Sequence, residues 1–423
     1  MTLRRLQPHQ VEELRREAVD DATLARAAEI VREVREGGIG TLRGFAETFG
    51  ERTVEQPLVI EQSELRRALD DLAFEQRALL ERTARRIDTF ALAQKAALKD
   101  LAVPVPGGEA GHNITPVERA GCYAPGGRYP LPSSVLMTAV TARAAGVDEV
   151  WVASPRPAPI TLAAAAVAGA DGLLAVGGAH AIAALAYGVG GPPPCEVVVG
   201  PGNRWVTAAK KVVAGDVGID MLAGPSELVV LADHTADADV VAADLLAQAE
   251  HDPDALPVLV TTDTTLASAV DRALERQLID LPTREIAAAA LNNGFTVIVS
   301  DLDEAAGVCD RLAPEHLQVL TEDAEEVAGR VTHYGGLFIG SMSAEVFGDY
   351  GIGPNHTLPT GGVARFKGGL SVFDFLRVRT WLRMDGGPGA ATAVADAAAL
   401  ARLEGLEAHA RAAERRRTVL PSD

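Results

Sequence analysis

The sequence predicts an α/β protein with two Rossmann-like αβ lobes, each built on a parallel-sheet core, together with a helical N-terminal region and an extended helical C-terminal tail. From about residue 133 onward, short apolar runs alternate with Ala-rich helical segments, which is typical of a parallel sheet covered by helices. A second alternating run of the same kind follows. Residues 9–100 lack this alternation and carry a helical apolar pattern instead.

The N-terminal part of the chain, residues 9–100, is expected to be mostly helical. Its apolar residues recur at a spacing near 3.6 and its charged residues fill the opposite face, as in an amphipathic helix. Gly37 and Gly38 give a stop signal within this region. Two stretches carry the pattern, "VEELRREAVDDATLARAAEIVREVREGG" and "SELRRALDDLAFEQRALLERTARRIDTFALAQKAAL".

The middle of the chain is expected to hold the two parallel sheets. In the first run the strands are "EVWVAS", "GLLAV" and "CEVVVG", and the helices are "SSVLMTAVTARAAG", "ITLAAAAVAGA", "AHAIAALAYG" and "RWVTAAKKVVAG". In the second run the strands are "SELVVLAD", "PVLVTT", "FTVIVS", "LQVLT" and "GLFIG". We expect a Rossmann-like lobe at residues 123–227, a larger αβ lobe formed by residues 1–122 and 228–370, and a helical tail at residues 371–423.

A long segment without a clear helical or strand pattern follows the second run. Residues 341–371, "SMSAEVFGDYGIGPNHTLPTGGVARFKGGLS", are rich in Gly, Pro and Ser. A loop of this length in a compact protein is usually functional. Residues 390–417, near the end of the chain, have the pattern of one long helix with a basic tip.

The charge and hydropathy of the chain exclude some classes of partner. The 423 residues carry a formal net charge of -19. Such an acidic chain is poorly suited to nucleic acid or to an anionic membrane surface, both of which attract positive charge. The N-terminus has no apolar core of a signal peptide. The longest uncharged stretch, residues 172–195, is broken by glycines and ends in prolines, so it is a poor membrane span. These features favour a cytoplasmic protein acting on a small substrate.

The cysteines do not form a recognisable chemical site. Cys122, Cys195 and Cys309 are far apart in the sequence and form no CxxC motif. A disulfide framework or a thiolate zinc site is therefore not expected. We expect all three to be buried side chains.

Glycine-rich turns in the first run favour a nucleotide ligand. The segments "AVGGAHA" (175–181) and "VVGPGNRW" (198–205) each lie between a predicted strand and a predicted helix. In "AGCYAPGGRYPLPSS" (120–134), Gly126 and Gly127 come just before a predicted helix. Loops at the carboxyl ends of parallel strands bind ligands, and their free N–H groups suit phosphate. Neither GxGxxG nor GxxxxGK[ST] is present, so ordinary tight turns remain an alternative for each loop.

Several polar side chains are candidates for a metal or catalytic site. In "LLAQAEHDP" (245–253), Gln248 and His251 are three residues apart and so lie on one face of a helix end. Imidazole, carboxylate and amide oxygen together suit Zn²⁺. The alternative is a solvated helix end, and spacing alone does not decide between the two. Further candidates follow in "APEHLQV", "FGDYGIGPNH" and "EGLEAH", namely Glu315, His316, Asp349, His356, Glu404 and His409.

These segments, in order over nearly the whole chain, resemble the histidinol dehydrogenase family. The matching stretches are "GCYAPGGRYPLPSSVLMTAVTARAAGV", "VGGAHAIAALAYG", "GPGNRWVTAAKK", "AGPSELVVLAD", "DLLAQAEHDPDA", "RLAPEHLQV", "GDYGIGPNHTLPTGG" and "EGLEAHARA". The resemblance implies a zinc-dependent, NAD-using homodimer. It further implies oxidation of L-histidinol through histidinaldehyde to L-histidine in two hydride transfers, as a step of histidine biosynthesis.

The resemblance assigns roles to particular residues. It implies one zinc ion per subunit, held by Gln248, His251, Asp349 and His409, with the tail that carries His409 exchanged into the partner subunit's site. His316 would be the general base for the alcohol proton, and Glu315 would activate water to attack the aldehyde. Substrate-contacting positions would be Ser226, Gln248, His251, His316, Asp349, His356, Glu404 and His409.

The resemblance also places the cofactor in the lobe at residues 123–227. Tyr123, His180 and Asn203 match cofactor-contacting positions. The family typically has Gln where this chain has His180, and the loop at 120–134 is somewhat unusual. Imidazole can still donate a hydrogen bond to a ribose or phosphate oxygen. These two departures leave the choice of cofactor geometry and substrate open.

Three other functions remain possible from the sequence. One is a related zinc- and NAD-dependent dehydrogenase for another small polar alcohol, such as a sulfonated diol. Another is a zinc hydrolase, because zinc with Glu315 could activate water without NAD. A third is a catalytically silent binding protein, although a binder has no use for the proton acceptor that His316 supplies.

Overall fold

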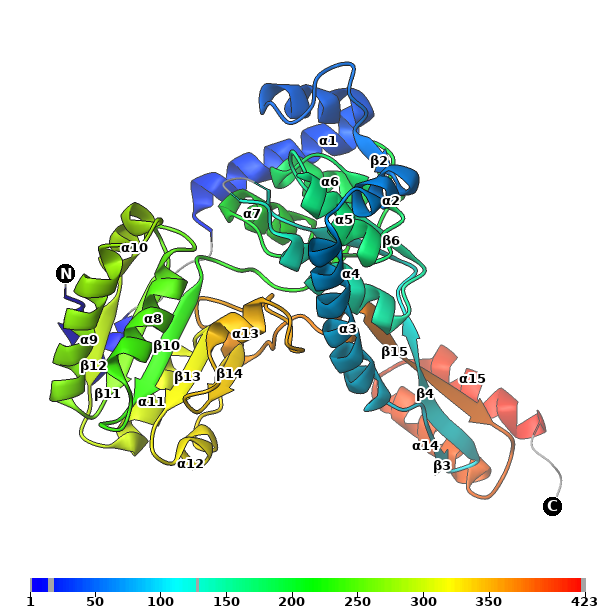
Figure 1. The fold of residues 1–423 in the computed structure, drawn as a ribbon. Helices are drawn as coiled ribbons and strands as arrows, with labels where there is room; N and C mark the ends of the chain where they lie inside the picture. Colours follow the sequence, from blue (N-terminus) through cyan, green and yellow to red (C-terminus); the bar gives the residue numbers. More distant parts are fainter. Residues whose placement is uncertain (1, 14–18, 127–128, 420–423) are drawn as a thin grey trace. The chain divides into compact units, whose positions relative to one another are not determined.

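The computed structural model describes residues 2–13, 19–126 and 129–419, and it divides into two compact units (Figure 1). Unit 1 comprises Met1–Ala93 and Val117–Phe375, and unit 2 comprises Gln94–Pro116 and Leu376–Asp423. Unit 1 holds two sheets with mostly parallel strands, which confirms the α/β class predicted from the alternating runs.

The first sheet of unit 1 has the strand order β2-β7-β6-β5-β8-β9. Its strands pair in parallel, except that β2 runs antiparallel to β7. β7 and β8 are buried along their whole length, as expected of strands covered on both faces. The strands are β2 Val59–Glu61, β5 Arg119–Tyr123, β6 Glu149–Ala153, β7 Gly172–Leu174, β8 Val197–Val199 and β9 Gly218–Ile219.

Two groups of helices pack on this first sheet. One group is α2 with α5 and α4, and the other is α1 with α6 and α7. The predicted helices of the first alternating run are therefore all present. Their bounds are α1 Asp21–Thr48, α2 Gln62–Asp70, α4 Pro132–Ala145, α5 Pro159–Val167, α6 Gly178–Tyr187 and α7 Arg204–Val213.

The N-terminal helix joins this sheet, whereas the sequence placed residues 1–122 with the other lobe. Leu42 of α1 packs in one core cluster with Leu58 and Leu174, and its side chain is fully buried. Burial of such a side chain contributes about 1.5–3 kcal/mol to the free energy of folding, which stabilises the packing of α1 on this sheet. The stop signal expected at Gly37 and Gly38 is found as a break within α1, because Gly38 has the non-helical angles φ 60° and ψ -148°.

The second sheet of unit 1 has the strand order β1-β12-β11-β10-β13-β14, and all of its pairs are parallel. The strands predicted in the second run are found within two residues of their expected positions. The unpredicted β1 extends the edge beside β12. The strands are β1 Arg4–Leu6, β10 Glu227–Ala232, β11 Leu256–Thr261, β12 Phe295–Ile298, β13 His316–Leu320 and β14 Gly336–Ile339.

Helices also form two groups around this second sheet. α8 packs with α9 and α10, and α11 packs with the short helix η1. Their bounds are η1 Pro8–Glu13, α8 Ala238–Ala249, α9 Thr264–Leu278, α10 Arg284–Leu291, α11 Leu302–Leu312 and α12 Ala324–Ala328. The long segment 341–371 is mainly irregular, with α13 Glu345–Asp349 and η2 Val363–Arg365 inside it and η3 Val372–Phe375 after it.

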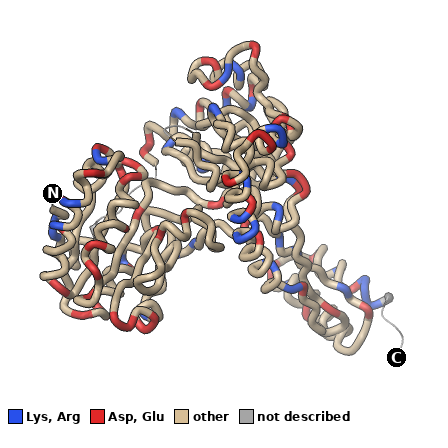
Figure 2. The backbone as a smooth tube through the Cα atoms, viewed as in Figure 1, with Lys and Arg blue, Asp and Glu red and all other residues tan. Residues whose placement is uncertain are grey.

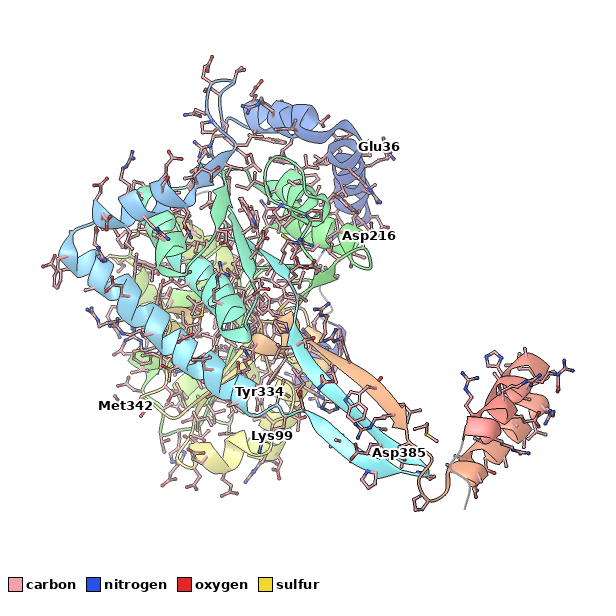
Figure 3. The ribbon with its side chains drawn as sticks, turned by 90° about the vertical axis from the view of Figure 1, so that its right-hand side faces the viewer. Glu36, Lys99, Asp216, Tyr334, Met342 and Asp385 are labelled. Atoms are coloured by element: carbon pink, nitrogen blue, oxygen red, sulfur yellow. The ribbon has the colours of Figure 1, made fainter. Side chains whose placement is uncertain are left out.

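Unit 2 contains an antiparallel sheet and a pair of helices. Its strands β3 Leu101–Val105, β4 Gly108–Pro116 and β15 Leu376–Met384 pair in the order β15-β4-β3 and were not predicted. Asp385, labelled in Figure 3, follows β15 and donates its N–H to the carbonyl of Gly107. The single long helix expected at 390–417 is broken, because Gly405 has φ 77° between α14 Ala390–Leu403 and α15 Glu407–Arg415. The helix α3, Phe74–Ala96, runs from unit 1 into the first residues of unit 2.

Charge and cysteine placement agree with the sequence predictions. Figure 2 shows acidic and basic residues interspersed along the chain. Within the described residues, no helix combines the length and the apolar character that a membrane crossing requires. Cys122, Cys195 and Cys309 are free and buried, and burial raises the pKa of the Cys122 thiol to about 12.

Candidate functional site

Gln248 lies in the last turn of α8, and His251 follows directly after the C-cap of this helix; they are the pair singled out from the sequence. Asp237 caps the start of α8, and the helix ends with Glu250 as its C-cap. Gln248 is completely buried, and among the described residues neither its amide oxygen nor its amide nitrogen has a hydrogen-bond partner. The solvated alternative therefore fails for Gln248, although His251 is exposed. A buried amide without partners is costly, so this side chain is suited to a ligand.

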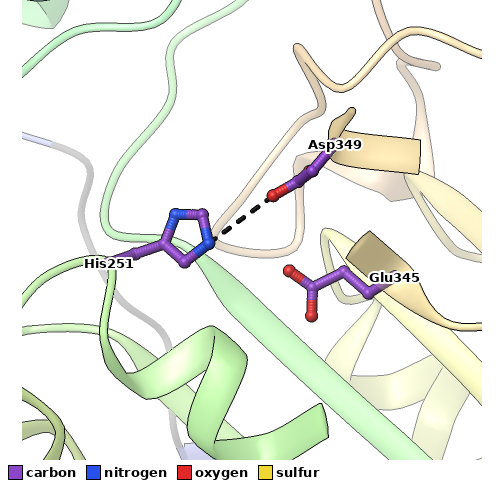
Figure 4. A group of neighbouring side chains, drawn as sticks. All are labelled: His251, Glu345 and Asp349. Atoms are coloured by element: carbon purple, nitrogen blue, oxygen red, sulfur yellow. Dashed lines mark ion pairs between the residues drawn. The ribbon is translucent and has the colours of Figure 1, made fainter. Parts of the chain in front are cut away.

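Asp349 approaches His251 from the opposite side of the site, as Figure 4 shows. The two are joined by an ion pair in which His251 Nε2 lies 3.5 Å from Asp349 Oδ2. Glu345, one turn earlier on α13, presents its carboxylate to the same space. The ligand atoms of these three residues all lie within 4.8 Å of one another. They form a group that could hold a metal ion.

Glu345 was missed by the sequence reasoning. Its side chain is 1% exposed, and within the described part of the chain neither carboxylate oxygen accepts a hydrogen bond. The signal available was its spacing: Glu345 precedes Asp349 by four residues in "SAEVFGDYG", which puts both carboxylates on one face of a helical turn. The Gly-rich surroundings hid this turn inside a segment expected to be a loop.

The predicted catalytic pair lies at the amino end of β13, beside the amino end of β10. Glu315 Oε2 accepts a hydrogen bond of 2.8 Å from the N–H of Glu227. His316 Nδ1 lies 3.0 Å from the Glu227 carbonyl oxygen, which can only accept, so Nδ1 carries the proton. In the neutral ring Nε2 is therefore the free base. Among the described residues, Nε2 has no hydrogen-bond partner, and it lies 3.7 Å from Asp349 Oδ1.

Burial and mutual repulsion shift the pKa values of this cluster. Burial raises the pKa of Glu315 to about 8 and that of Glu345 to about 8. Burial lowers the pKa of His316, but the neighbouring carboxylates Glu315, Glu345 and Asp349 outweigh it and raise that pKa to about 10 in the metal-free site. A bound divalent cation would offset these carboxylates and lower that pKa again, which a proton acceptor at Nε2 requires. Burial raises the pKa of Asp349, but the adjacent His316 and the imidazoles of His356 and His251 leave it below its ordinary value. The site thus holds more buried acid than its own histidines neutralise.

This donor set fits a zinc ion. Zn²⁺ takes imidazole nitrogen and carboxylate oxygen as ligands, and a divalent cation would favour the ionised form of these buried carboxylates. The buried carboxylates of Glu345 and Asp349 converge with His251. Gln248, whose buried amide has no partner among the described residues, lies three residues before His251. The fit rests on the chemistry of the donors and on these unsatisfied polar atoms.

We expect the thermal stability of the metal-free protein to fall as pH rises from about 5 to about 9. Glu315, Glu345 and His316 have pKa values raised by folding, so the folded state binds more protons than the unfolded state across this range. The stability that these protons give is complete below the unfolded pKa values and is lost as pH passes through the folded ones. Melting curves recorded with a chelator over this pH series would measure the slope.

The matched control is Glu345→Gln, which removes one of these protons and should flatten the slope. A melting temperature that stays constant or rises over the same range would contradict the account of the cluster.

The remaining predicted substrate contacts in unit 1 lie on two segments near this cluster. Ser226 precedes β10 and is partly buried. His356 Nδ1 donates to the carbonyl of Asp349 at 3.0 Å, and its Nε2 lies 3.5 Å from Ser134 Oγ on α4. Burial lowers the pKa of His356. Asn355 ties the same segment to α4 through a 2.8 Å bond to the Met137 carbonyl.

Glu404 and His409 belong to unit 2. Glu404 is the C-cap of α14, His409 lies in the first turn of α15, and both are exposed. Gly405 separates the two helices. The structure therefore presents both side chains on the surface of unit 2, and their predicted roles stay predictions.

The predicted cofactor contacts Tyr123 and Asn203 lie at the carboxyl edge of the first sheet. Tyr123 ends β5, and its hydroxyl accepts a 3.2 Å hydrogen bond from the N–H of Gly178. Asn203 caps α7 by accepting from the N–H groups of Trp205 and Val206 at 3.0 and 3.3 Å. Asn203 is exposed. Gly127, part of the glycine-rich turn after β5, lies outside the described residues.

His180 has partners within the chain that the sequence did not indicate. Its Nε2 lies 2.9 Å from Glu51 Oε2, and its ring stacks on Phe45 and Phe49 with centroid distances of 5.5 and 5.4 Å. Glu51 also accepts from the N–H of Gly177 at 3.2 Å. With Nε2 paired in this way, contact between His180 and a cofactor stays a prediction.

The chain is similar to known proteins over nearly its whole length. A family model described as histidinol dehydrogenase matches residues 13–417. A histidinol dehydrogenase from Aromatoleum aromaticum is 44% identical over 399 residues, covering 93% of this chain and 91% of that protein. One from Thermus thermophilus is 46% identical over 390 residues, covering 92% and 93%. The crystal structure of histidinol dehydrogenase from Elizabethkingia anophelis matches with a TM-score of 0.92 at 30% identity, covering 99% of both chains.

Proposed function

The chain belongs to the histidinol dehydrogenase family, and on this premise we propose that it oxidises L-histidinol through histidinaldehyde to L-histidine. The proposed cofactors are NAD and one zinc ion per subunit. The observation that carries the proposal is the convergence of His251, Glu345 and Asp349, with Asp349 also 3.7 Å from His316 Nε2, which has no hydrogen-bond partner among the described residues. A metal-binding group and a proton acceptor so close together suit an alcohol oxidation assisted by a metal.

Zinc would be held by Gln248, His251 and Asp349, with His409 supplied by a second subunit of a homodimer. His409 is exposed on unit 2, which suits a residue that serves another chain. Glu404 precedes it in the same helix pair and would meet a positively charged end of the substrate. When bound, zinc would supply a Lewis acid for the amine and imidazole nitrogens of histidinol, and NAD would accept the hydride in each oxidation.

His316 and Glu315 would move the protons. In the first oxidation His316 Nε2 accepts the hydroxyl proton as the C–H bond breaks, because the Glu227 carbonyl fixes the other nitrogen as the protonated one. In the second stage Glu315 takes a proton from the water that attacks the aldehyde, giving a hydrate that is oxidised to the carboxylate. The Glu227 N–H holds Glu315 in place for this step.

The cofactor would lie along the carboxyl edge of the first sheet. Tyr123 ends β5 and Asn203 begins α7, and both lie where open parallel sheets bind nucleotides. His180 is proposed as a third contact to the cofactor, and only the family resemblance supports it. We expect this reaction in the cytoplasm, where the free thiols of Cys122, Cys195 and Cys309 would stay reduced.

The test is the appearance of NADH when zinc-loaded protein is mixed with L-histidinol and NAD. We expect two NADH per histidinol consumed, with histidine as the product. A panel of other small alcohols, sulfonated diols included, should give lower kcat/KM. If folded, zinc-loaded protein formed no NADH, this result would contradict the proposal. If another alcohol gave a higher kcat/KM than L-histidinol, that alcohol would become the proposed substrate.

A further inference from the structure

A buried ion pair lies below the loop that follows β8. Lys210 of α7 and Asp220 after β9 contact each other through Nζ and Oδ1, and their side chains are 3% and 0% exposed. Taking both charges out of water is expensive, and apolar residues of similar size would often be as stable. Stability alone therefore does not account for this ion pair.

The pair holds both polar groups of one glycine. Lys210 Nζ donates to the carbonyl of Gly200 at 3.0 Å, and Asp220 Oδ2 accepts from the N–H of Gly200 at 2.8 Å. Gly200 has φ 119°, which L side chains rarely adopt. A Cβ there would lie 2.0 Å from the carbonyl oxygen of Tyr123. The ion pair thus fixes an unusual backbone conformation in direct contact with the end of β5.

This glycine lies at the point where the connections of the first sheet diverge. β5 lies between β6 and β8. The chain leaves β5 toward β6 on one side, and it enters β8 from β7 by crossing to the other side. Ligands of open α/β sheets bind in the crevice outside such a switch point. Gly200 starts the loop to Asn203, and Tyr123 lies opposite.

The segment that carries Asp220 continues to the catalytic pair. Ala223 accepts from Thr207 Oγ1 of α7 at 2.7 Å, and Gly224 donates to Thr360 Oγ1 at 2.5 Å. Glu227 then bonds Glu315 and His316 through its N–H and its carbonyl. One stretch, residues 220–227, thus holds Gly200 at its first residue and the catalytic pair at its last.

We propose that Lys210 and Asp220 are positioning residues for the cofactor. By holding Gly200 in its left-handed conformation, the ion pair sets the loop from Gly200 to Asn203 before the dinucleotide binds. The inference rests on the proposed function, because it takes this loop as part of the NAD site. It predicts that loss of the pair weakens NAD binding while leaving the histidinol side of the reaction unchanged.

The experiment compares four proteins: wild type, Lys210→Met, the double variant Lys210→Met/Asp220→Asn, and the control Lys211→Met. Lys211 is the next residue on the same helix and is exposed, so it loses the same charge without breaking a buried pair. The measurements are melting temperature, KM for NAD, KM for histidinol and kcat, with NAD affinity taken from calorimetry. The wild type is measured first, and its turnover of histidinol tests the proposed function separately.

We expect Lys210→Met to lower the melting temperature, because it leaves Asp220 charged and unpaired. The double variant removes that orphan charge and should recover most of the melting temperature. Its KM and dissociation constant for NAD should nevertheless stay raised by roughly tenfold, with kcat and KM for histidinol within about twofold of wild type. Lys211→Met should match wild type in every measurement.

Recovery of NAD affinity together with stability in the double variant would overturn the proposal, since the pair would then be structural only. Equal losses in NAD and histidinol parameters would overturn it too. Should the double variant not fold, Lys210→Met alone decides, measured below its melting temperature, because it removes the group that donates to the Gly200 carbonyl. A selective rise of KM for NAD in that variant supports the proposal, and an unchanged KM overturns it. If the wild type binds NAD but does not oxidise histidinol, the proposed function fails while the positioning proposal is still tested. The NAD dissociation constants from calorimetry then decide it.

Discussion

Replacing His316 by Asn is expected to slow the oxidation of histidinol by about 10²- to 10⁴-fold, the usual contribution of a general base. The free Nε2 of His316 is the proton acceptor, and Asn offers none. Oxidation of histidinaldehyde should fall far less, because its water is activated by Glu315. The rates of NADH formation from the alcohol and from the aldehyde, measured separately, check this expectation.

The matched variant is Glu315→Gln, which should show the opposite pattern and slow the aldehyde stage more than the alcohol stage. Its amide oxygen can still accept from the N–H of Glu227, so the fold of this corner should persist. Equal slowing of both stages in His316→Asn would refute the division of labour between the two residues.

Zinc affinity and activity should both collapse in His251→Asn and in His409→Asn, since each removes a proposed ligand. Mixing the two variants should restore activity to about a quarter of wild type. Random exchange between symmetric dimers makes about half of them mixed, and each mixed dimer has one intact site of two. The measurement is kcat of the mixture after subunit exchange, with each variant mixed with itself as the control.

Activity of about a quarter of wild type is expected only if His409 binds the zinc ion of the other subunit. Were His409 to bind the zinc of its own chain, no mixed dimer would gain an intact site. Activity that stays at the level of the separate variants would therefore contradict the exchanged tail.

Much of the fold follows from local patterns in the sequence. Among the described residues, eight of the twelve strands in the two sheets of unit 1 were predicted, because burial on both faces leaves an uninterrupted apolar signal. The strands β1, β2, β5 and β9 were not predicted. The sheet of unit 2 was missed because its strands are mostly exposed, and β15 lacks such a run. The attachment of α1 to the first sheet was also missed, since an amphipathic pattern does not say which surface a helix covers.

The sequence predicted most residues of the candidate site, but it did not predict the contacts between them. Gln248 and His251 could be paired because they are three residues apart at a helix end, although His251 lies just after the C-cap of α8. The role of the Glu227 backbone in fixing the tautomer of His316 could not be predicted, because it depends on two strands lying side by side. Glu51 was missed as the partner of His180 for the same reason, as it is 129 residues away along the chain.

The position of the site within its sheet is also informative. The predicted cofactor residues lie at the carboxyl ends of their strands, where the general rule for α/β sheets puts ligands. Glu315 and His316 instead lie at the amino end of β13, beside the amino end of β10. This rule alone would have placed the site at the carboxyl edge of the second sheet, which is the wrong edge. The polar residue types and the family resemblance indicated the right one.

The most direct test of the central claim is the zinc content of the purified protein, measured per chain by elemental analysis. The account predicts close to one zinc in the wild type, and a large loss in Gln248→Ala, His251→Asn and His409→Asn, with Lys211→Met as the unaffected control. A wild type without bound zinc, or zinc retained equally by all of these variants, would show that these side chains do not meet on a metal ion.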